Sequence, residues 1–279
     1  MATVIIPAHN EQTVIAGTLD HLLQDLDDDP VQVIVVCNGC TDLTAELARE
    51  FAPLVEVLEL AEPSKTAAIN AGESIARSFP HVILDADVAL SAESLKAIID
   101  ALAAPGALAA EPRPVFDTAR SSYPVQAFYR VWLALHGGRP GDIGSGAYAM
   151  SETGRSRFGM FPEIIGDDAY ARAHFEHDEI IDVTDSESLV RAPRTTRDLV
   201  RIKTRSRLGQ WELARKYPEL WQEKRARTEP LLFKAGGISP RIWLDVPLYL
   251  VIQVWIRSRA AALYRNFDDY QWERDDRTV

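Results

Sequence analysis

Two aspartates separated by one residue, Asp85 and Asp87, stand directly after a short apolar run, Val82–Leu84. Residues i and i+2 of an extended segment project to the same side, so these two carboxylates can be presented together. Paired carboxylates suit a hard divalent cation that keeps open positions for phosphate oxygens. Acidic pairs also end strands simply because they are soluble, so the pattern alone does not establish a metal site.

A second acidic pair, Asp167 and Asp168, follows about eighty residues later and opens a helix-like stretch. Acids at the start of a helix commonly act as caps and interact favourably with the helix dipole. A carboxylate in a reactive site can instead serve as a general base that removes the proton of an attacking hydroxyl. Residue type and position allow both interpretations.

Both cysteines of the chain, Cys37 and Cys40, lie in one loop with the sequence CNGC. A structural zinc site needs four ligands, and the sequence offers no second cysteine pair. A redox pair is compatible with this position, because a helix N-terminus can lower the pKa of a thiol. A third interpretation is that the cysteines are small, half-buried loop residues.

Apolar runs and helix-periodic stripes alternate over the first hundred residues, beginning with an apolar run and a stripe from Ile15 to Leu26. Near-continuous Val, Ile and Leu runs with helices between them predict an α/β fold, in which a mostly parallel, Rossmann-like sheet is flanked by helices. The runs expected to form strands are Thr3–Ile6, Val31–Val36, Val55–Leu60 and Val82–Leu84.

Three polar loops are expected at one edge of this sheet, because parallel strands end on the same side and ligands bind beyond their carboxyl ends. The loops are Pro7–Glu11 after the first strand, Cys37–Asp42 after the second and Asp85–Asp87 after the fourth. The first acidic pair therefore shares its edge with two further sets of polar groups, which favours a ligand site.

The chain resembles the nucleotide-sugar-binding half of glycosyltransferase family 2, inverting enzymes of the GT-A fold, in four ordered segments: IIPAHNE, VVCNGCTD, KTAAINAG and ILDADV. The resemblance implies that the first two loops hold the base and ribose of a nucleotide-sugar donor. It also implies that the D-x-D pair holds Mn²⁺ or Mg²⁺ on the donor diphosphate, with Asp85 and Asp87 as metal ligands. The donor-binding residues implied are Pro7, Ala8, Asn10, Glu11, Asn38, Lys65, Asp85, Ala86 and Asp87.

The second loop departs from the family pattern, because Cys37 and Asn38 stand where relatives often have two aspartates. An amide can still pair with a base edge. The match of Asn38, Gly39 and Asp42 to the glycosyltransferase loop favours the cysteines as loop residues over a redox pair.

The resemblance extends into the second half of the chain. Gly146 lies in a glycine-bearing segment that resembles the one lying against the donor sugar, and glycine allows close backbone approach. Asp167 and Asp168 resemble the family's E-D motif, which implies that Asp168 is the catalytic base and that Asp167 takes the Glu position. Arg205 falls where relatives often place a mobile segment that closes on the diphosphate. The Q-x-x-R-W pattern of processive enzymes is absent, which disfavours polymer synthesis.

The net charge of −11 argues against a general nucleic-acid binder. Charge is nevertheless uneven, since residues 191–234 carry 13 Lys and Arg against 5 Asp and Glu. This stretch is either a solvated helix face or a surface that meets phosphates or an anionic membrane. The N-terminus enters an apolar run by residue 3 without a leader-like segment, which predicts a cytoplasmic protein.

The segment Ile242–Ile256 is apolar, has tryptophans near both ends and is followed by arginines. Its fifteen residues, interrupted by Asp245 and Gln253, are fewer than the roughly twenty that a membrane span needs. It can pack on its own domain, pair with a second subunit in a homodimer, or lie in a membrane interface at the inner face of the membrane. The membrane interpretation would suit a lipid-linked acceptor.

Together, these patterns predict a metal-dependent, inverting, hexosyltransferase-type enzyme that moves a sugar from a UDP-sugar to a hydroxyl acceptor, such as a lipid-linked or polysaccharide precursor. Residues 1–106 form the expected donor half, 107–234 the acceptor and base half, and 235–279 a C-terminal helical extension. One alternative is a sugar-phosphate nucleotidyltransferase, whose usual glycine-rich, arginine-bearing first loop is absent. Another is a non-catalytic protein that binds nucleotide sugars.

Overall fold

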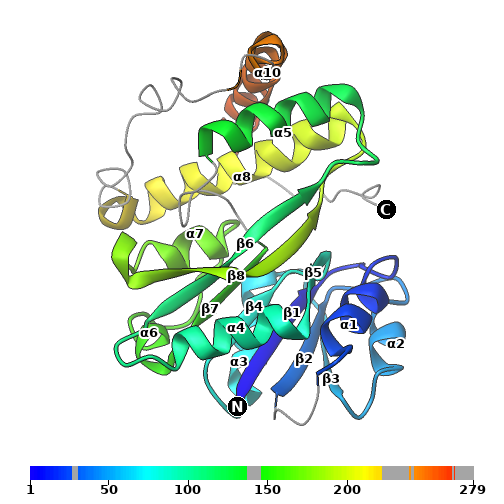
Figure 1. Ribbon diagram of the computed structural model, residues 1–279, viewed down its shortest axis with the longest axis vertical. Coiled ribbons are helices and arrows are strands. Elements are labelled where there is room, and N and C mark those ends of the chain that lie inside the picture. The colour runs from blue at the N-terminus through cyan, green and yellow to red at the C-terminus, as the bar shows by residue number, and fades with distance from the viewer. Residues whose placement is uncertain (27–30, 137–145, 222–238, 240–241, 266, 268–279) are drawn as a thin grey trace. The chain divides into compact units, whose positions relative to one another are not determined.

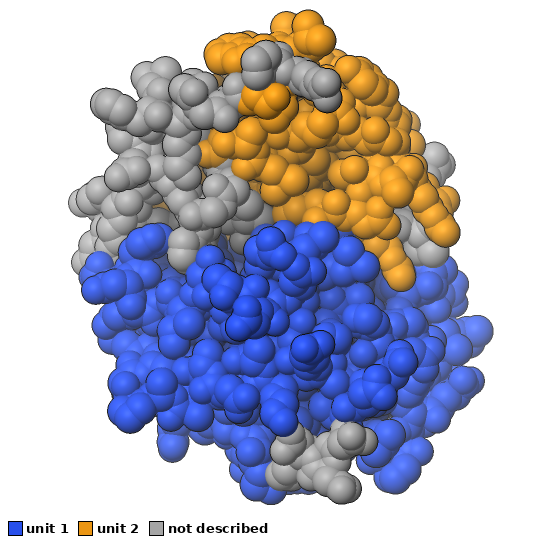
Figure 2. Space-filling model, in the orientation of Figure 1, with its two compact units in different colours: residues 1–115, 144–190, 279 blue, residues 116–143, 191–278 orange. Residues whose placement is uncertain are grey.

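The computed structural model describes residues 1–26, 31–136, 146–221, 239, 242–265 and 267. The chain divides into two compact units, which are coloured separately in Figure 2. The first comprises residues 1–115 and 144–190, and the second residues 116–143 and 191–278. The division by role at residues 106 and 234 is a functional one and stays a prediction.

Four parallel strands form one half of an eight-stranded sheet in the order β3-β2-β1-β4 (Figure 1). In β1, Ile5 lies opposite Ile34 of β2 and Ile83 of β4. These strands coincide with the four apolar runs of the sequence, since parallel strands buried on both faces need continuous apolar residues. Their bounds are β1 Ala2–Ala8, β2 Val31–Asn38, β3 Val55–Leu60 and β4 His81–Leu84.

Antiparallel pairings join β7 with β4, β6 with β7 and β8 with β5. The full order is β3-β2-β1-β4-β7-β6-β8-β5. The predicted α/β class is confirmed. The sequence did not reveal β5, because three residues are too few to show a period. The bounds are β5 Val88–Leu90, β6 Ala109–Asp117, β7 Ala147–Met150 and β8 Ile180–Arg191.

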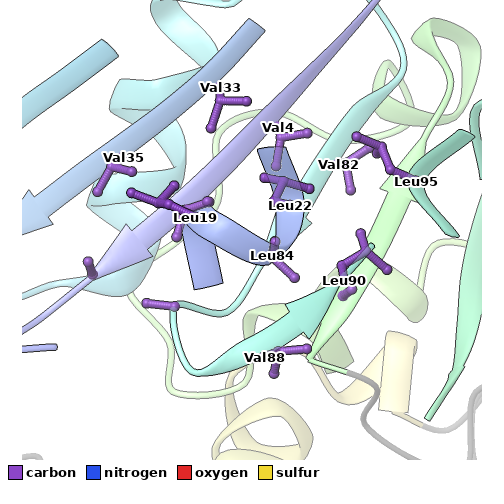
Figure 3. Close-up of a cluster of buried hydrophobic side chains, with 14 of the residues drawn as sticks. Val4, Leu19, Leu22, Val33, Val35, Val82, Leu84, Val88, Leu90 and Leu95 are labelled. Atoms are coloured by element: carbon purple, nitrogen blue, oxygen red, sulfur yellow. The ribbon is translucent and has the colours of Figure 1, made fainter. Parts of the chain in front are cut away.

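Helices cover the sheet, and alternate residues of β1 serve its two faces. Val4 of β1 joins a buried cluster with Leu19 and Leu22 of α1 (Figure 3). Ile5 points to the opposite face, where it meets Gly72 of α3. A Cβ at position 72 would lie 2.6 Å from Ile5 Cγ2, so glycine is needed for this close approach. The helices are α1 Ile15–Leu23, α2 Thr44–Arg49, α3 Lys65–Ile75 and α4 Ala92–Leu102.

Serine caps fix where two of these helices begin. The hydroxyl of Ser64 accepts the N–H of Ala67 before α3, and Ser91 accepts the N–H of Ser94 before α4. Such caps stabilise a helix start by about 1 kcal/mol. The remaining helical segments of the first unit are α6 Glu152–Arg155, α7 Asp167–Arg172 and the short η1 His177–Glu179.

The second unit is helical, with a core of its own, which confirms the predicted C-terminal helical extension. Tyr249, Ile252 and Ile256 of α10 are buried in a cluster with Phe128 of α5 and Leu199 of α8. None of the helices described is both long and apolar enough to cross a bilayer. The bounds are α5 Tyr123–His136, α8 Thr196–Lys216, η3 Ile242–Leu244 and α10 Val246–Tyr264.

Candidate active site

Lys65 brings together two predicted site residues from different parts of the chain. Its Nζ atom lies 2.7 Å from Oδ1 of Asp85 and 2.9 Å from Oδ1 of Asp167. The Ser64 cap fixes Lys65 as the first residue of α3, Asp85 follows β4, and Asp167 is the first residue of α7. The two acidic pairs found in the sequence are therefore linked through one ammonium group.

Asp167 is held inside the protein, with only 2% of its surface exposed. The Tyr148 hydroxyl donates a hydrogen bond of 3.0 Å to its Oδ2 atom. Burial raises the pKa of Asp167 above its ordinary value, while Lys65 acts in the opposite direction. Burial alone would lower the pKa of Lys65, but Asp167 and Asp85 raise it overall, so the lysine stays protonated. Both oxygens of Asp167 thus have defined donors.

Asp168 differs from its neighbour. It is half-buried, and its Oδ1 atom accepts the N–H of Ala169 at 2.7 Å. It also lines a small cavity together with Glu111, Tyr148 and Arg172. Of the two acids, Asp168 is therefore the one that meets open space, whereas Asp167 is anchored by Lys65 and Tyr148.

The loops after β1 and β2 are braced against each other. Asn10, which has a φ of 55°, accepts the N–H of Thr41 on its Oδ1 atom at 2.6 Å. The N–H of Glu11 donates to Oγ1 of Thr44 at 2.7 Å. These bonds place the predicted donor-binding residues Asn10 and Glu11 beside the second loop, as expected for strands that end at one edge.

Asn38 is turned into the protein, with 1% of its surface exposed. Its Nδ2 atom donates to the carbonyl oxygen of Ala8 at 2.9 Å. The backbone carbonyl oxygen of Asn38 lies 2.6 Å from Nδ1 of His9. Its Oδ1 atom is buried and has no hydrogen-bond partner within the described part of the chain. The amide that could pair with a base edge thus uses its nitrogen to hold the end of β1, which carries Pro7 and Ala8.

Gly39 follows with a φ of +59°, and a Cβ there would lie 2.7 Å from the backbone nitrogen of Pro63. The second loop therefore needs glycine at this position for both its backbone angle and the space.

The two cysteines are free and lie close together in this loop. A hydrogen bond from the Cys37 side chain lowers the pKa of Cys40 to about 6, and the N–H of Asn10 donates to Cys40 Sγ at 3.3 Å. The same hydrogen bond, together with burial, raises the pKa of Cys37. Cys40 thus helps to hold the first loop.

The acidic loop between β4 and β5 fits a divalent cation in its donor atoms. Asp87 is exposed and Asp85 is half-buried, so both can offer carboxylate oxygens, which hard cations prefer. Within the described ranges no group of three His, Cys, Asp or Glu residues could hold a metal. A cation at this loop would be held through the carboxylate oxygens of Asp85 and Asp87.

Gly146 shapes this loop from the next strand. Its carbonyl accepts the N–H of Asp85 at 2.8 Å, and its φ is +65°. A Cβ at this position would lie 2.4 Å from Cγ2 of Val88 and 3.5 Å from Oδ2 of Asp85. Glycine is thus required at this position, because the Val88 side chain already occupies the space that a Cβ would need.

Arg205, which the sequence analysis singled out, and Tyr148, which it did not, lie in different parts of the structure. Arg205 is half-buried on α8, in the second unit, and its predicted contact with the donor stays a prediction. Tyr148 was missed by sequence reasoning, although it stands two residues after Gly146 in the segment singled out there. A tyrosine in a short apolar strand gives no sign that its hydroxyl meets a carboxylate.

Comparison with known proteins adds a family and a fold. The model of glycosyl transferase family 2 matches residues 3–153, which is more than half of the chain. This range includes the three loops, Lys65 and Gly146, but ends before Asp167. The comparison with curated proteins gave no match.

Two solved structures illustrate the fold. One is a mannosyltransferase from Pyrobaculum calidifontis in complex with GDP-Man and Mn²⁺, with 23% identity, a TM-score of 0.61, and coverage of 97% of this chain and 76% of that one. The other is glucosyl-3-phosphoglycerate synthase from Mycobacterium tuberculosis, in complex with Mn²⁺, UDP and glucosyl-3-phosphoglycerate. It has 21% identity, a TM-score of 0.53, and coverage of 77% and 79%. These similarities confirm the predicted GT-A fold, and the family match shows that the chain belongs to glycosyl transferase family 2.

Proposed function

We propose that this protein transfers a sugar from a nucleotide-diphosphate donor, a UDP-sugar, to a hydroxyl acceptor with inversion at the anomeric carbon. The observation that carries the proposal is the double ion pair of Lys65 with Asp85 and Asp167. It joins the loop suited to a donor diphosphate to the acidic pair suited to acceptor activation. Both solved relatives are described with Mn²⁺, one with GDP-Man and one with UDP, which supports a nucleotide-sugar donor.

The donor half of the reaction uses the acidic loop. Asp85 and Asp87 would hold Mn²⁺ or Mg²⁺, which supplies positive charge against the leaving diphosphate. Gly146, whose carbonyl accepts the N–H of Asp85, would lie against the donor sugar, and Asn10 and Glu11, which are hydrogen-bonded to the second loop, would contact the nucleoside. Arg205 would add a guanidinium to the diphosphate, since arginine matches phosphate geometry in a bidentate way.

The acceptor half uses Asp168. Its carboxylate takes the proton of the acceptor hydroxyl as the hydroxyl oxygen forms a bond to the anomeric carbon, and the bond from that carbon to the diphosphate breaks. Direct displacement from the opposite side inverts the configuration. Asp167 positions this base, because Lys65 and Tyr148 engage its two oxygens and it is the adjacent first residue of α7.

A panel of nucleotide sugars tests this proposal. The full chain is incubated with Mn²⁺ and UDP-Glc, UDP-Gal, UDP-GlcNAc or GDP-Man, and release of the nucleoside diphosphate is measured. We expect release from one UDP-sugar, and loss of this release on Asp87→Asn substitution or addition of EDTA. Release from GDP-Man alone would show that the nucleobase of the donor is guanine and would overturn the proposal of a UDP-sugar. Binding of a nucleotide sugar without any release, with a mixture of sugar and glyceric acid acceptors present, would overturn the enzymatic proposal.

A further inference from the structure

Helix α10 carries apolar residues on two opposite sides. On one side, Tyr249, Ile252, Ile256 and Ala260 recur every three or four residues and are all buried. Tyr249, Ile252 and Ile256 belong to the core that α10 forms with α5 and α8. This side satisfies the simplest expectation from the sequence, which was that the segment packs on its own domain.

The other side of the same segment is exposed. The residues between the buried positions recur with the same helical period, so they lie on the opposite side. Of the twelve large hydrophobic side chains that are exposed in the described chain, six fall within residues 243–255. Their exposed fractions are Trp243 51%, Leu244 83%, Leu250 55%, Val251 64%, Val254 64% and Trp255 48%. Trp243 and Leu244 lie in η3, directly before the helix, and the other four lie in α10; we call these six residues the α10 apolar face. Such clustering marks an interaction surface, whereas single exposed apolar residues are ordinary.

Positive charge adjoins this face. Arg257 is exposed on the next turn of α10, Arg265 is exposed directly after the helix, and the helix contains no Asp or Glu. Among the described residues, the acid adjacent to the start of the helix is Asp245, which is 4% exposed and accepts bonds from Arg130 and from the Tyr123 hydroxyl. The exposed side of α10 is therefore apolar in its first half and basic in its second, in a chain whose net charge is −11.

We propose that the α10 apolar face binds the surface of an anionic lipid bilayer. The leucine and valine side chains would enter the outer acyl region, and the two indoles would lie at the headgroup level, where tryptophan is favoured. Arg257 and Arg265 would meet lipid phosphates. The helix would lie in the interface, consistent with the finding that no described helix can span a bilayer.

The arrangement of charge favours a bilayer over a second copy of the chain. A two-fold axis would apply the same face of α10 to itself. If the two copies of α10 ran parallel, the arginines of one copy would face the arginines of the other. If they ran antiparallel, the arginines of each copy would face the apolar half of the other. An anionic bilayer meets both halves at once, because it offers acyl chains below and phosphates at its surface.

Flotation of the full chain with lipid vesicles tests the proposal. We expect the protein to float with vesicles of phosphatidylcholine and phosphatidylglycerol, and to bind vesicles of phosphatidylcholine alone much more weakly. The Val251→Glu, Val254→Glu double variant should lose flotation. The Arg257→Gln, Arg265→Gln double variant should weaken binding to anionic vesicles, by about fivefold for each arginine removed.

A matched control is available in the first unit, where Leu54 and Leu189 are 64% and 38% exposed. The Leu54→Glu, Leu189→Glu variant introduces the same charge and should float like the unmodified chain. Absence of flotation for the unmodified chain would overturn the proposal, as would equal binding to neutral vesicles. A dimer in light scattering that the Val251→Glu, Val254→Glu variant converts to a monomer would assign the face to a second copy. The readout is vesicle binding, so the result is independent of the proposed transfer activity.

Discussion

The ammonium of Lys65 and the carboxylate of Asp167 lie 2.9 Å apart, although about a hundred residues separate them in the sequence. The carboxylate is almost fully buried, so the lysine is the group that makes its negative charge tolerable there. Removing one partner of a buried ion pair costs more than the pair itself contributes, because the remaining charge is left without compensation.

We therefore expect Lys65→Met to lower the free energy of unfolding by about 3 kcal/mol at neutral pH. The control is Arg77→Met, which removes an exposed pair with Glu56 and should cost less than about 1 kcal/mol. Chemical denaturation of the three proteins measures both values. Adding Asp167→Asn to Lys65→Met should restore part of the lost free energy of unfolding. Failure of this rescue would contradict the assignment of Lys65 as the group that compensates the buried charge of Asp167.

The same pair predicts a dependence of stability on pH. Burial raises the pKa of Asp167, so the folded chain holds this proton more tightly than the unfolded chain. The contribution of Asp167 is then most favourable below the unfolded carboxyl pKa of about 4 and declines as the pH rises through the raised folded pKa. Without the opposing effect of Lys65, the decline in Lys65→Met should be larger and extend to higher pH. Unfolding curves at a series of pH values check this; a constant difference between the two proteins would refute it.

Tyr148→Phe should lower the free energy of unfolding by about 1–3 kcal/mol, because Oδ2 of Asp167 loses its donor inside the protein. Tyr123→Phe is a matched control, since the Tyr123 hydroxyl donates to Asp245 while its ring is 62% exposed. The control should cost less and leave nucleotide binding unchanged. Equal losses in the two variants would show that burial of Asp167 is not what makes Tyr148 important.

Asp87→Asn should abolish the strengthening of UDP binding by Mn²⁺, because an exposed carboxylate at this loop is replaced by a neutral amide. Asp182→Asn, at another exposed position of the same unit, should retain the full effect. Titration calorimetry with and without EDTA measures the change in UDP affinity that Mn²⁺ causes. Identical UDP affinity of the unmodified protein in both conditions would rule out a metal at this loop.

Asp168→Asn should reduce transfer by about 10² to 10⁴ while folding and donor binding persist, since an amide cannot take up a proton. Asp167→Asn should reduce transfer less, because Asp167 already has Lys65 and Tyr148 as partners. Transfer rates at saturating donor decide between them. The reverse order of losses would make Asp167 the base, and normal turnover in both variants would place the base elsewhere.

Alkylation of Cys40 should reach half its maximal rate near pH 6, because the Cys37 side chain stabilises its thiolate. Cys37→Ala removes this hydrogen bond, so the midpoint should move to higher pH. An unchanged midpoint would contradict the contact.

The Cys37→Ser, Cys40→Ser variant should keep most of its transfer activity; insulin reduction by the unmodified protein, lost in this variant, would instead indicate a redox function.

Local patterns were sufficient to predict the parallel half of the sheet and the edge where its loops meet. The runs around Ile5, Ile34 and Ile83 are continuous because these strands are buried on both faces. The antiparallel partner of β4 was not predictable, because β7 has only four residues, too few to show a strand period. Tyr148 was missed because its importance comes from a contact between strand β7 and helix α7.

The sequence was sufficient to predict which residue types form the candidate site. It was not sufficient to predict the directions in which their side chains point. The acidic pairs and Lys65 were identified from motifs, and the structure brings Lys65, Asp85 and Asp167 together. The side chain of Asn38 faces the interior, which no pattern in the loop sequence indicates, because an amide at a strand end has the same local propensity in either direction.

Gly39 and Gly146 have a consequence for engineering this protein. Each combines a positive φ with a neighbour that any added Cβ would strike, Pro63 in one case and Val88 in the other. A mutant library randomised across the donor loops would therefore lose most of its folded members at these two positions, whatever the selection. Changes in donor preference are better sought at Glu11, because its contact with Thr44 is made by the backbone N–H and is retained with a new side chain.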